Sequence, residues 1–138
     1  MIVKEKITNN SNETMDYASS ILPYFKASCV YGLNGDLASG KTTFIKGLMK
    51  AMKYKEMVNS PTFTLINEYD AKIKVVHIDC YREKDINRWI DIGILEYFNS
   101  NSIILIEWPE IIKEILPIDT RYINFENLGD DKRRIKIP

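Results

Sequence analysis

The chain has 138 residues, the size of one domain with a single hydrophobic core, and we expect one domain over residues 1–138. Its 19 basic and 19 acidic residues cancel, whereas proteins that hold nucleic acid by its phosphates usually carry a positive excess. The one basic cluster, Lys132, Arg133 and Arg134, is predicted to be the solvated side of a terminal strand.

No apolar run approaches the roughly 20 residues of a membrane-spanning helix, and no signal-peptide pattern opens the chain. The two cysteines, Cys29 and Cys80, are isolated and make no metal-ligand spacing. We therefore expect a cytoplasmic protein with free thiols and no membrane partner.

The first half of the chain is predicted to hold two units of a strand followed by a helix. Residues 2–7 indicate a strand, and Asn10, with a glutamate three residues later, is a weak capping signal for a helix that Pro23 should end or kink. Residues 28–33 predict a buried strand, and apolar residues at helical spacing predict a helix over 41–52.

The second half is predicted to be richer in strands. Residues 102–107 read Ser-Ile-Ile-Leu-Ile-Glu, and a strand that is apolar on both faces is typical of the middle of a covered parallel sheet. Gly93 lowers the helical propensity of its segment. The remaining expected elements are a hairpin of 64–70 and 72–79, helices over 85–98 and 110–116, and strands over 122–126 and 133–137 joined by a polar turn.

The strongest motif is a glycine-bounded loop between the second strand and its helix. Its run Gly-Asp-Leu-Ala-Ser-Gly-Lys-Thr fits the phosphate-binding pattern G-x-x-x-x-G-K-[ST]. The backbone N–H groups of such a loop form an anion nest, and the helix that follows adds the positive end of its dipole. The residues predicted to bind a nucleoside triphosphate are Gly35, Asp36, Leu37, Ala38, Ser39, Gly40, Lys41, Thr42 and Thr43.

This loop and the element order together predict an α/β, P-loop NTPase-like three-layer sandwich with central parallel strands and antiparallel strands at the edges. Lys41 is expected to supply charge to the β- and γ-phosphates, and the hydroxyl of Thr42 to ligate Mg²⁺. The alternative is a glycine-rich turn before an ordinary basic amphipathic helix.

Hydrolysis of ATP needs a carboxylate for Mg²⁺ or water and a group that senses the γ-phosphate. Glu107 ends the apolar strand and is predicted to be a catalytic residue and, with Thr42, a metal ligand, because ligands bind at the carboxyl ends of strands in open α/β sheets. Thr62, after a proline, is the candidate sensor, although Ser-Pro-Thr is commonly only a turn.

A further polar group follows on the strand predicted over 72–79. Alternation places His77, Asp79 and Tyr81 on one face, where Asp79 could hold Mg²⁺ through water or orient the attacking water. Arg82 could neutralise phosphate charge. The alternative is a polar edge strand that satisfies its own hydrogen bonds.

Four motifs in order resemble one family. They are Gly-Asp-Leu-x-x-Gly-Lys-Thr-Thr-Phe (35–44), Ser-Pro-Thr-Phe (60–63), His-x-Asp-x-Tyr-Arg (77–82) and Glu-Trp-Pro-Glu (107–110). Together they resemble the TsaE (YjeE) family, the small bacterial ATPases of tRNA threonylcarbamoyladenosine biosynthesis, over roughly residues 10–125.

The resemblance implies a weak ATPase that works with the partner proteins TsaD and TsaB. Together these proteins would support transfer of a threonylcarbamoyl group to N6 of adenosine 37 in tRNA, with the transfer chemistry in TsaD and tRNA met only through the complex. Carried over by motif, Lys41 and Thr42 match the family's phosphate and Mg²⁺ residues and Glu107 its acidic catalytic residue. Thr62 matches a switch-like threonine and Asp79 the second carboxylate.

One departure from the family pattern lies in the loop, where Ala38 and Ser39 replace a frequent Gly-Ala. If the glycine serves a positive φ, Ala38 would strain the loop. Trp108 matches the tryptophan that follows the family's acid.

Two other functions remain open from the residues. A small-molecule kinase would need an arginine-bearing lid, and residues 110–116 after the acidic strand carry no arginine. A nucleotide-gated binding module would release no phosphate even with its partners. A guanine-specific switch is disfavoured because the chain has no Asn-Lys-x-Asp run, which leaves ATP as the expected nucleotide.

Overall fold

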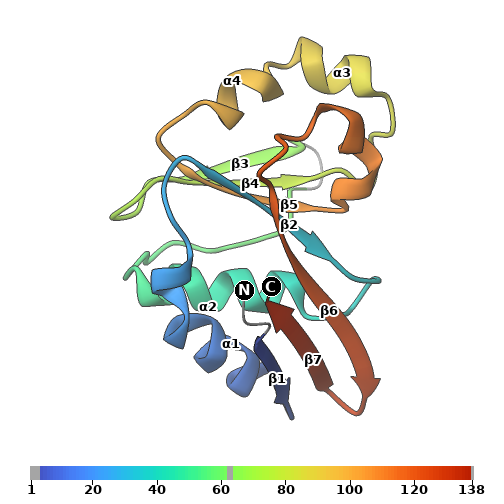
Figure 1. The fold of residues 1–138 in the computed structure, drawn as a ribbon. Helices are drawn as coiled ribbons and strands as arrows, with labels where there is room; N and C mark the ends of the chain where they lie inside the picture. The colour runs from blue at the N-terminus through green and yellow to red at the C-terminus, as the bar shows by residue number, and fades with distance from the viewer. Residues whose placement is uncertain (1–3, 62–63, 138) are drawn as a thin grey trace.

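The computed structural model describes residues 4–61 and 64–137, which form a seven-stranded sheet with helices on both faces (Figure 1). The strand order in the sheet is β1-β7-β6-β2-β5-β4-β3. In chain order the elements are β1 (Lys4–Thr8), α1 (Ser11–Ser20), the 3₁₀ helix η1 (Leu22–Tyr24), β2 (Cys29–Asn34), α2 (Lys41–Ala51), β3 (Ile66–Tyr69), β4 (Val75–Asp79), α3 (Ile86–Asp91), α4 (Ile94–Phe98), β5 (Ile103–Glu107), the 3₁₀ helix η2 (Pro109–Ile115), β6 (Arg121–Gly129) and β7 (Lys132–Ile137).

The middle of the sheet is parallel and its edges are antiparallel. β2 pairs in parallel with both β5 and β6, and β5 pairs in parallel with β4. The pairs β3–β4, β6–β7 and β1–β7 are antiparallel. The predicted fold class is therefore confirmed, and β5, buried at all five positions, is the central covered strand that its apolar run indicated.

Side chains that alternate along the central strands form two cores, one on each face. On β5, Ile103 and Leu105 pack into the core that α1 and α2 cover. Ile104 and Ile106 pack into the other core with Trp89 of α3. Figure 1 shows α1 and α2 on one side of the sheet and α3 and α4 on the other, which gives the three layers.

The predicted helix over 85–98 is wrong as a single helix. Asp85 caps α3 as expected, since its side chain accepts a hydrogen bond from the N–H of Asn87. Gly93 then adopts a φ of 91°, a left-handed conformation that favours glycine, and this turn separates α3 from α4. The break divides the segment into two short helices.

Two other segments differ from the prediction in detail. The helix expected over 110–116 is the 3₁₀ helix η2, which starts at Pro109 and is kinked at Ile112. The last polar loop is shorter than expected, because β6 continues to Gly129 and the turn is made by Asp130 and Asp131, both with positive φ.

The carboxyl ends of β2, β4 and β5 lie at the same edge of the sheet, because the three strands are parallel. The glycine-bounded loop follows β2 and leads directly into α2. Within residues 4–61 and 64–137, no helix is both long and apolar enough to cross a membrane.

Candidate functional site

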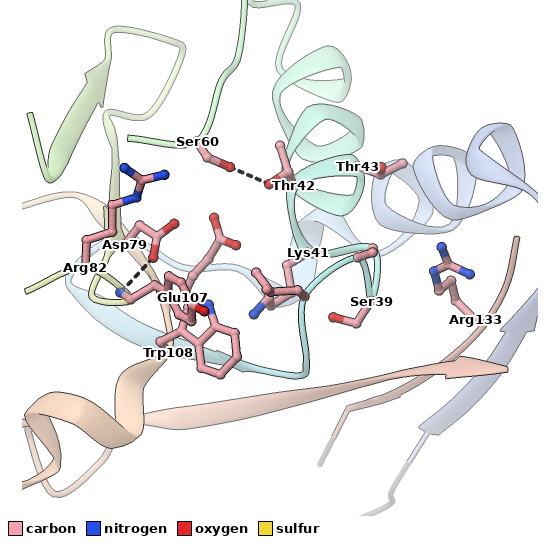
Figure 2. Close-up of a pocket in the computed structure, with 14 residues that line it drawn as sticks. Ser39, Lys41, Thr42, Thr43, Ser60, Asp79, Arg82, Glu107, Trp108 and Arg133 are labelled. Carbon is pink, nitrogen blue, oxygen red and sulfur yellow. Dashed lines mark hydrogen bonds between the residues drawn. The ribbon is translucent and has the colours of Figure 1, made fainter. Parts of the chain in front are cut away.

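A pocket of about 480 Å³ lies at this edge of the sheet, between the loop after β2 and the ends of β4 and β5 (Figure 2). We call the loop and the first turn of α2, residues 35–43, the phosphate-loop wall, and the ends of β4 and β5, with Asp79 and Glu107, the acidic wall. The pocket is lined by Leu37, Ala38, Ser39, Gly40, Lys41, Thr42, Thr43, Ser60, Asp79, Tyr81, Arg82, Glu107, Trp108 and Arg133.

The backbone of the phosphate-loop wall needs glycine at two places. A Cβ at Gly35 would lie 2.6 Å from Ser39 Oγ and 2.8 Å from the carbonyl oxygen of Phe125, so any side chain there would displace the loop. Gly40 has a φ of 102° and caps the amino end of α2. Gly35 and Asp36, both predicted to bind the nucleotide, belong to the loop but do not line the pocket.

Ala38 has a φ of 59°, a left-handed conformation that is strained for alanine. Its carbonyl oxygen accepts a hydrogen bond of 3.3 Å from the side-chain amide of Asn127 on β6. The strain considered for Ala38 is therefore present, and a neighbouring strand supports the residue that carries it.

Lys41 is the cation of the phosphate-loop wall and is only 5% exposed. Its Nζ donates a 2.6 Å hydrogen bond to the carbonyl oxygen of Gly35 and lies 4.1 Å from the centroid of the Trp108 ring. Burial lowers the pKa of Lys41, while the nearby carboxylates of Glu107 and Asp79 raise it. The ammonium is thus held between the loop and the acidic wall (Figure 2).

Trp108 follows the acidic strand and has an unusual backbone conformation, with a φ of 57°. Its ring lies against Lys41 and also against the ring of Tyr81, at a centroid distance of 4.9 Å. The tryptophan therefore packs at the site itself. The strand prediction did not foresee this conformation, because nothing local in the sequence requires a left-handed residue there.

Asp79 and Glu107 stand opposite each other in the register of β4 and β5. Glu107 is 4% exposed, and its Oε2 lies 2.6 Å from Nε2 of His77, which is fully buried. Asp79 Oδ1 accepts a 3.0 Å hydrogen bond from the N–H of Tyr81. Burial raises the pKa of Asp79 and so does the charge of Glu107, while the Tyr81 N–H lowers it. Two close carboxylates of this kind favour a cation between them.

The hydroxyl of Thr42 lies 2.7 Å from that of Ser60, so the segment before Pro61 touches the first turn of α2. Ser60 lines the pocket, although the motif had indicated only Thr62 as a site residue. Thr62, the predicted sensor, lies outside the described residues. The expected hairpin of β3 and β4 is confirmed, and Tyr81 lies beyond the end of β4 with an exposed ring.

The donor groups fit a magnesium nucleotide. Mg²⁺ is usually held by one or two carboxylates together with substrate phosphates and water. Glu107, Asp79 and Thr42 offer such a partial set, and the described residues contain no group of three or more His, Cys, Asp or Glu side chains that would hold a metal alone. Ser39 Oγ is buried with no hydrogen-bond partner among the described residues, and it packs against Gly35.

Arg133 of β7 is the main lining residue that the sequence did not indicate. Its Cγ lies 3.4 Å from the position of a Cβ on Gly40, and Nη1 is held by Asn127 Oδ1 at 3.0 Å. Arg133 is half-buried against the phosphate-loop wall, so the prediction of a solvated basic strand is wrong for this residue. Lys132 is exposed as expected. The placement of Arg133 follows from strand order, which no local motif encodes.

A mixed sheet with parallel strands in its middle, a G-x-x-x-x-G-K-T loop between β2 and α2, and acids at the ends of β5 and β4 defines a P-loop NTPase-like α/β protein. The family model described as "Threonylcarbamoyl adenosine biosynthesis protein TsaE" matches residues 8–135. The chain belongs to the TsaE family, as its motifs indicated.

Relatives and a solved structure agree with this assignment. The tRNA threonylcarbamoyladenosine biosynthesis protein TsaE of Bacillus subtilis is 40% identical over 129 residues, which are 93% of this chain and 80% of the relative. The protein of the same name from Aquifex aeolicus is 39% identical over 99% of this chain and 96% of its own length. The crystal structure of Bacillus subtilis YdiB superposes with a TM-score of 0.83 at 34% identity, covering 99% of this chain and 84% of that one.

Proposed function

We propose that this protein is a Mg²⁺-dependent ATPase that supports formation of N6-threonylcarbamoyladenosine at position 37 of tRNA, working in complex with homologues of TsaD and TsaB. The observation that carries the proposal is that one pocket holds both a phosphate-binding loop and two carboxylates on its opposite wall. The curated relatives bear the name of this biosynthesis. We further infer that residues 1–138 act as one cytoplasmic domain and meet tRNA only through the complex.

The phosphate-loop wall would bind the triphosphate. Backbone N–H groups of residues 36–43 and the amino end of α2 would hold the phosphate oxygens, and Lys41 would place its charge between the β- and γ-phosphates. Lys41 already lies in the loop, bonded to the Gly35 carbonyl, so little reorganisation is needed for it to turn to a phosphate. Trp108 shields the same ammonium from water.

The acidic wall would carry out the hydrolysis. Glu107 and the hydroxyl of Thr42 would hold Mg²⁺, which when bound neutralises charge on the β- and γ-phosphates. Asp79, whose pKa is raised by burial and by Glu107, is suited to accept a hydrogen bond from the attacking water. Thr62 keeps its predicted role as the sensor of the γ-phosphate.

The segment after the acidic strand favours hydrolysis over phosphate transfer to a small molecule. η2 spans Pro109–Ile115 and contains no arginine with which to close over a phosphoryl acceptor. Arg133 and Arg82 are the arginines that line the pocket. Because η2 brings no arginine to the γ-phosphate, the site should turn over slowly alone and faster in the complex, where partner groups can complete the charge around that phosphate.

Phosphate release from ATP, measured with and without the TsaD and TsaB homologues, tests this proposal. We expect slow release by the protein alone, stimulation by the partners, and loss of turnover on removal of Mg²⁺. Lys41→Ala should lower nucleotide affinity by about 100-fold, a loss of roughly 2.7 kcal/mol of binding free energy. Lys46→Ala is the matched control, since Lys46 is exposed on the same helix.

Three outcomes would contradict the proposal. Equal nucleotide affinity in Lys41→Ala and the wild-type protein would contradict the assignment of the nucleotide site. Failure of the TsaD and TsaB homologues to change the rate of phosphate release would contradict the proposed complex. Faster phosphate transfer to a small hydroxyl compound than to water would indicate a kinase.

A further inference from the structure

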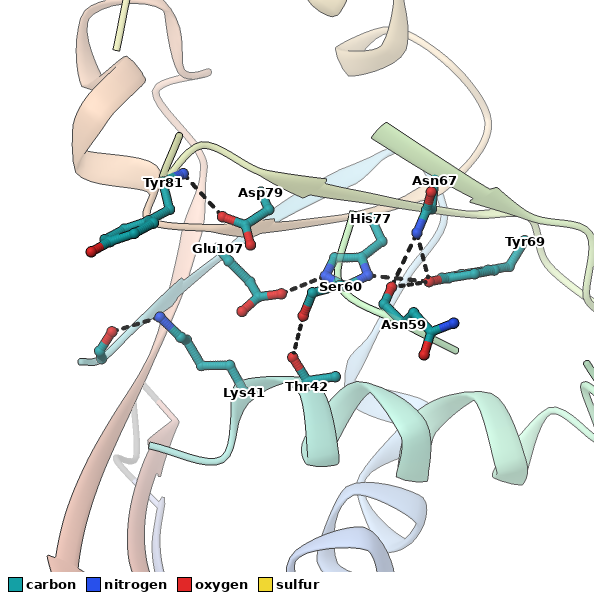
Figure 3. Close-up of polar contacts among 11 residues, drawn as sticks. Lys41, Thr42, Asn59, Ser60, Asn67, Tyr69, His77, Asp79, Tyr81 and Glu107 are labelled. Atoms are coloured by element: carbon teal, nitrogen blue, oxygen red, sulfur yellow. Dashed lines mark hydrogen bonds and ion pairs between the residues drawn. The ribbon is translucent and has the colours of Figure 1, made fainter. Parts of the chain in front are cut away.

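A chain of polar side chains runs from the acidic wall into the core beneath it (Figure 3). Glu107 Oε2 lies 2.6 Å from His77 Nε2, and His77 Nδ1 lies 3.3 Å from the hydroxyl of Tyr69 on β3. The same hydroxyl lies 3.0 Å from the carbonyl oxygen of Asn59. His77 is fully buried and Tyr69 is 4% exposed, so the two links from Glu107 to Tyr69 are shielded from bulk water, whereas Asn59 at the end of the chain is exposed.

The direction of these hydrogen bonds follows from the groups that make them. An ionised carboxylate only accepts, so His77 Nε2 carries the hydrogen that it donates to Glu107. In the neutral ring Nδ1 then has no hydrogen and accepts from Tyr69. The single hydroxyl hydrogen of Tyr69 therefore has two acceptors, His77 Nδ1 and the Asn59 carbonyl oxygen, and cannot serve both fully at once.

Asn59 precedes Ser60, the residue whose hydroxyl lies 2.7 Å from that of Thr42. One short segment thus contacts both sides of the pocket, Thr42 through Ser60 and Glu107 through Tyr69 and His77 (Figure 3). The Asn59 carbonyl is also held by the side-chain amide of Asn67 at 3.0 Å, so it stays satisfied if Tyr69 turns its hydrogen to His77.

We propose that His77 is a positioning residue that fixes the Glu107 carboxylate, and that Tyr69 couples this bond to the position of the Asn59–Ser60 segment. A displacement of Ser60 from Thr42 would shift the Tyr69 hydrogen toward His77 and so strengthen the hold on Glu107. The inference rests on the proposed ATPase function and extends it, since it names the residues that orient the carboxylate and the segment that controls them.

Hydroxyl removal at Tyr69 tests the coupling with little change in packing. In Tyr69→Phe we expect kcat for ATP to fall about tenfold, the lower end of the loss seen when hydrogen bonds behind a ligating group are removed, with KM within about twofold of wild type. His77→Leu should lower kcat by about 100-fold, and His77→Gln should recover part of that loss because an amide N–H can still donate to Glu107.

Tyr31→Phe is the matched control. Tyr31 is also fully buried, and its hydroxyl also bonds to the backbone, accepting from the N–H of Lys26 and donating to the carbonyl of Tyr24. It does not line the pocket. A loss of kcat caused by destabilisation alone would therefore appear in both tyrosine variants, whereas a loss through Glu107 would appear in Tyr69→Phe only.

A second measurement does not depend on hydrolysis. His77 is the only histidine of the chain, so its ring nitrogens give unambiguous ¹⁵N signals in nucleotide-free protein. We expect hydrogen on Nε2 and a hydrogen-bonded Nδ1 in the wild type. In Tyr69→Phe the Nδ1 signal should move toward that of a nitrogen that accepts no hydrogen bond. Ser60→Ala should also shift the Nδ1 signal, although this substitution leaves the hydrogen-bond partners of His77 in place.

The two readouts separate failure of this inference from failure of the proposed function. Absence of ATP turnover in the wild-type protein with its partners would contradict the proposed ATPase function, but the ¹⁵N signals would still test the hydrogen-bond chain. Unchanged His77 signals in Tyr69→Phe and Ser60→Ala, or equal kcat in Tyr69→Phe and Tyr31→Phe, would overturn the relay.

Discussion

The two walls of the pocket are held in place by different means. The phosphate-loop wall is a backbone structure, in which positive φ values at Ala38 and Gly40 turn the chain into the start of α2. The acidic wall is a side-chain structure, in which Glu107 is fixed by the buried His77 of the neighbouring strand. The first is encoded in consecutive residues, and the second needs the sheet register to join residues 30 positions apart.

This difference implies that the walls can be altered separately. A change in the loop should act on nucleotide binding, because the loop presents N–H groups and one buried cation to the phosphates. A change in the acidic wall should act on turnover, because its carboxylates are placed to meet the metal and the water. Substitutions confined to one wall should therefore leave the property that depends on the other wall unchanged.

Glu107→Gln should give the largest difference between an effect on turnover and an effect on nucleotide binding. The amide keeps the size of the side chain and a hydrogen-bonding partner for His77, but it loses the charge that would hold Mg²⁺ and stabilise the attack. We expect kcat to fall by about 100- to 1,000-fold, within the range for loss of a positioned catalytic group. Nucleotide affinity should stay within about threefold, measured by equilibrium binding beside phosphate release in one turnover.

Glu110→Gln is its control, because Glu110 is an exposed acid of η2 that does not line the pocket. A Glu107→Gln protein with wild-type kcat, or with affinity and kcat lost together, would contradict the division between the two walls.

Arg133→Gln should have a moderate effect on the phosphate-loop wall alone. The guanidinium lies against Gly40 and lines the pocket, so its removal takes one positive charge from the surroundings of a triphosphate. We expect affinity for ATP to fall about tenfold, or roughly 1.4 kcal/mol, and the difference to shrink at high ionic strength as salt screens the charge. The ratio of bound to free nucleotide at low and high salt measures both.

Its neighbour provides the control for that substitution. Arg134 points to the other side of β7, where it forms ion pairs with Glu5 at 2.8 Å and Glu126 at 2.6 Å. Arg134→Gln should leave the affinity for ATP unchanged. Equal losses in the two variants would show that only the overall charge of the hairpin counts.

The contrast between the walls also explains how much of the molecule the sequence could predict. The loop, the strand before it and the helix after it form one local pattern, and the structure has them at the expected residues. Glu107 could be placed at the end of a central strand because its apolar run requires burial on both faces. In these cases the cause lies within a few residues of its effect.

The rest depended on contacts between distant segments. Alternation put His77 and Asp79 on one face, but the bond from His77 to Glu107 follows from the pairing of β4 with β5. Arg133 could be assigned to a terminal strand, yet its contact with the loop follows from the order β7-β6-β2 in the sheet. Thr62 remains a prediction from its motif alone.

Ala38→Gly should have the smallest effect and act on the strain of the loop. The left-handed conformation costs alanine about 1 kcal/mol or more, and glycine loses about 0.5–1 kcal/mol through its freer unfolded chain, so the net gain in the free energy of unfolding should be about 0.5 kcal/mol. Ala51→Gly, in the last turn of α2, has no such strain to relieve and should lose up to about 1 kcal/mol. Urea denaturation of both variants measures the difference in sign.

If the loop and the acidic wall are held independently, the effect of Ala38→Gly on stability should be the same in the wild-type and Glu107→Gln backgrounds, within about 0.5 kcal/mol. A larger coupling would mean that the strain at Ala38 is transmitted through Lys41, whose ammonium joins the Gly35 carbonyl to the ring of Trp108 beside the acid. A loss of stability in Ala38→Gly as large as that in Ala51→Gly would instead show that Asn127, by holding the Ala38 carbonyl, already compensates the strained φ in full.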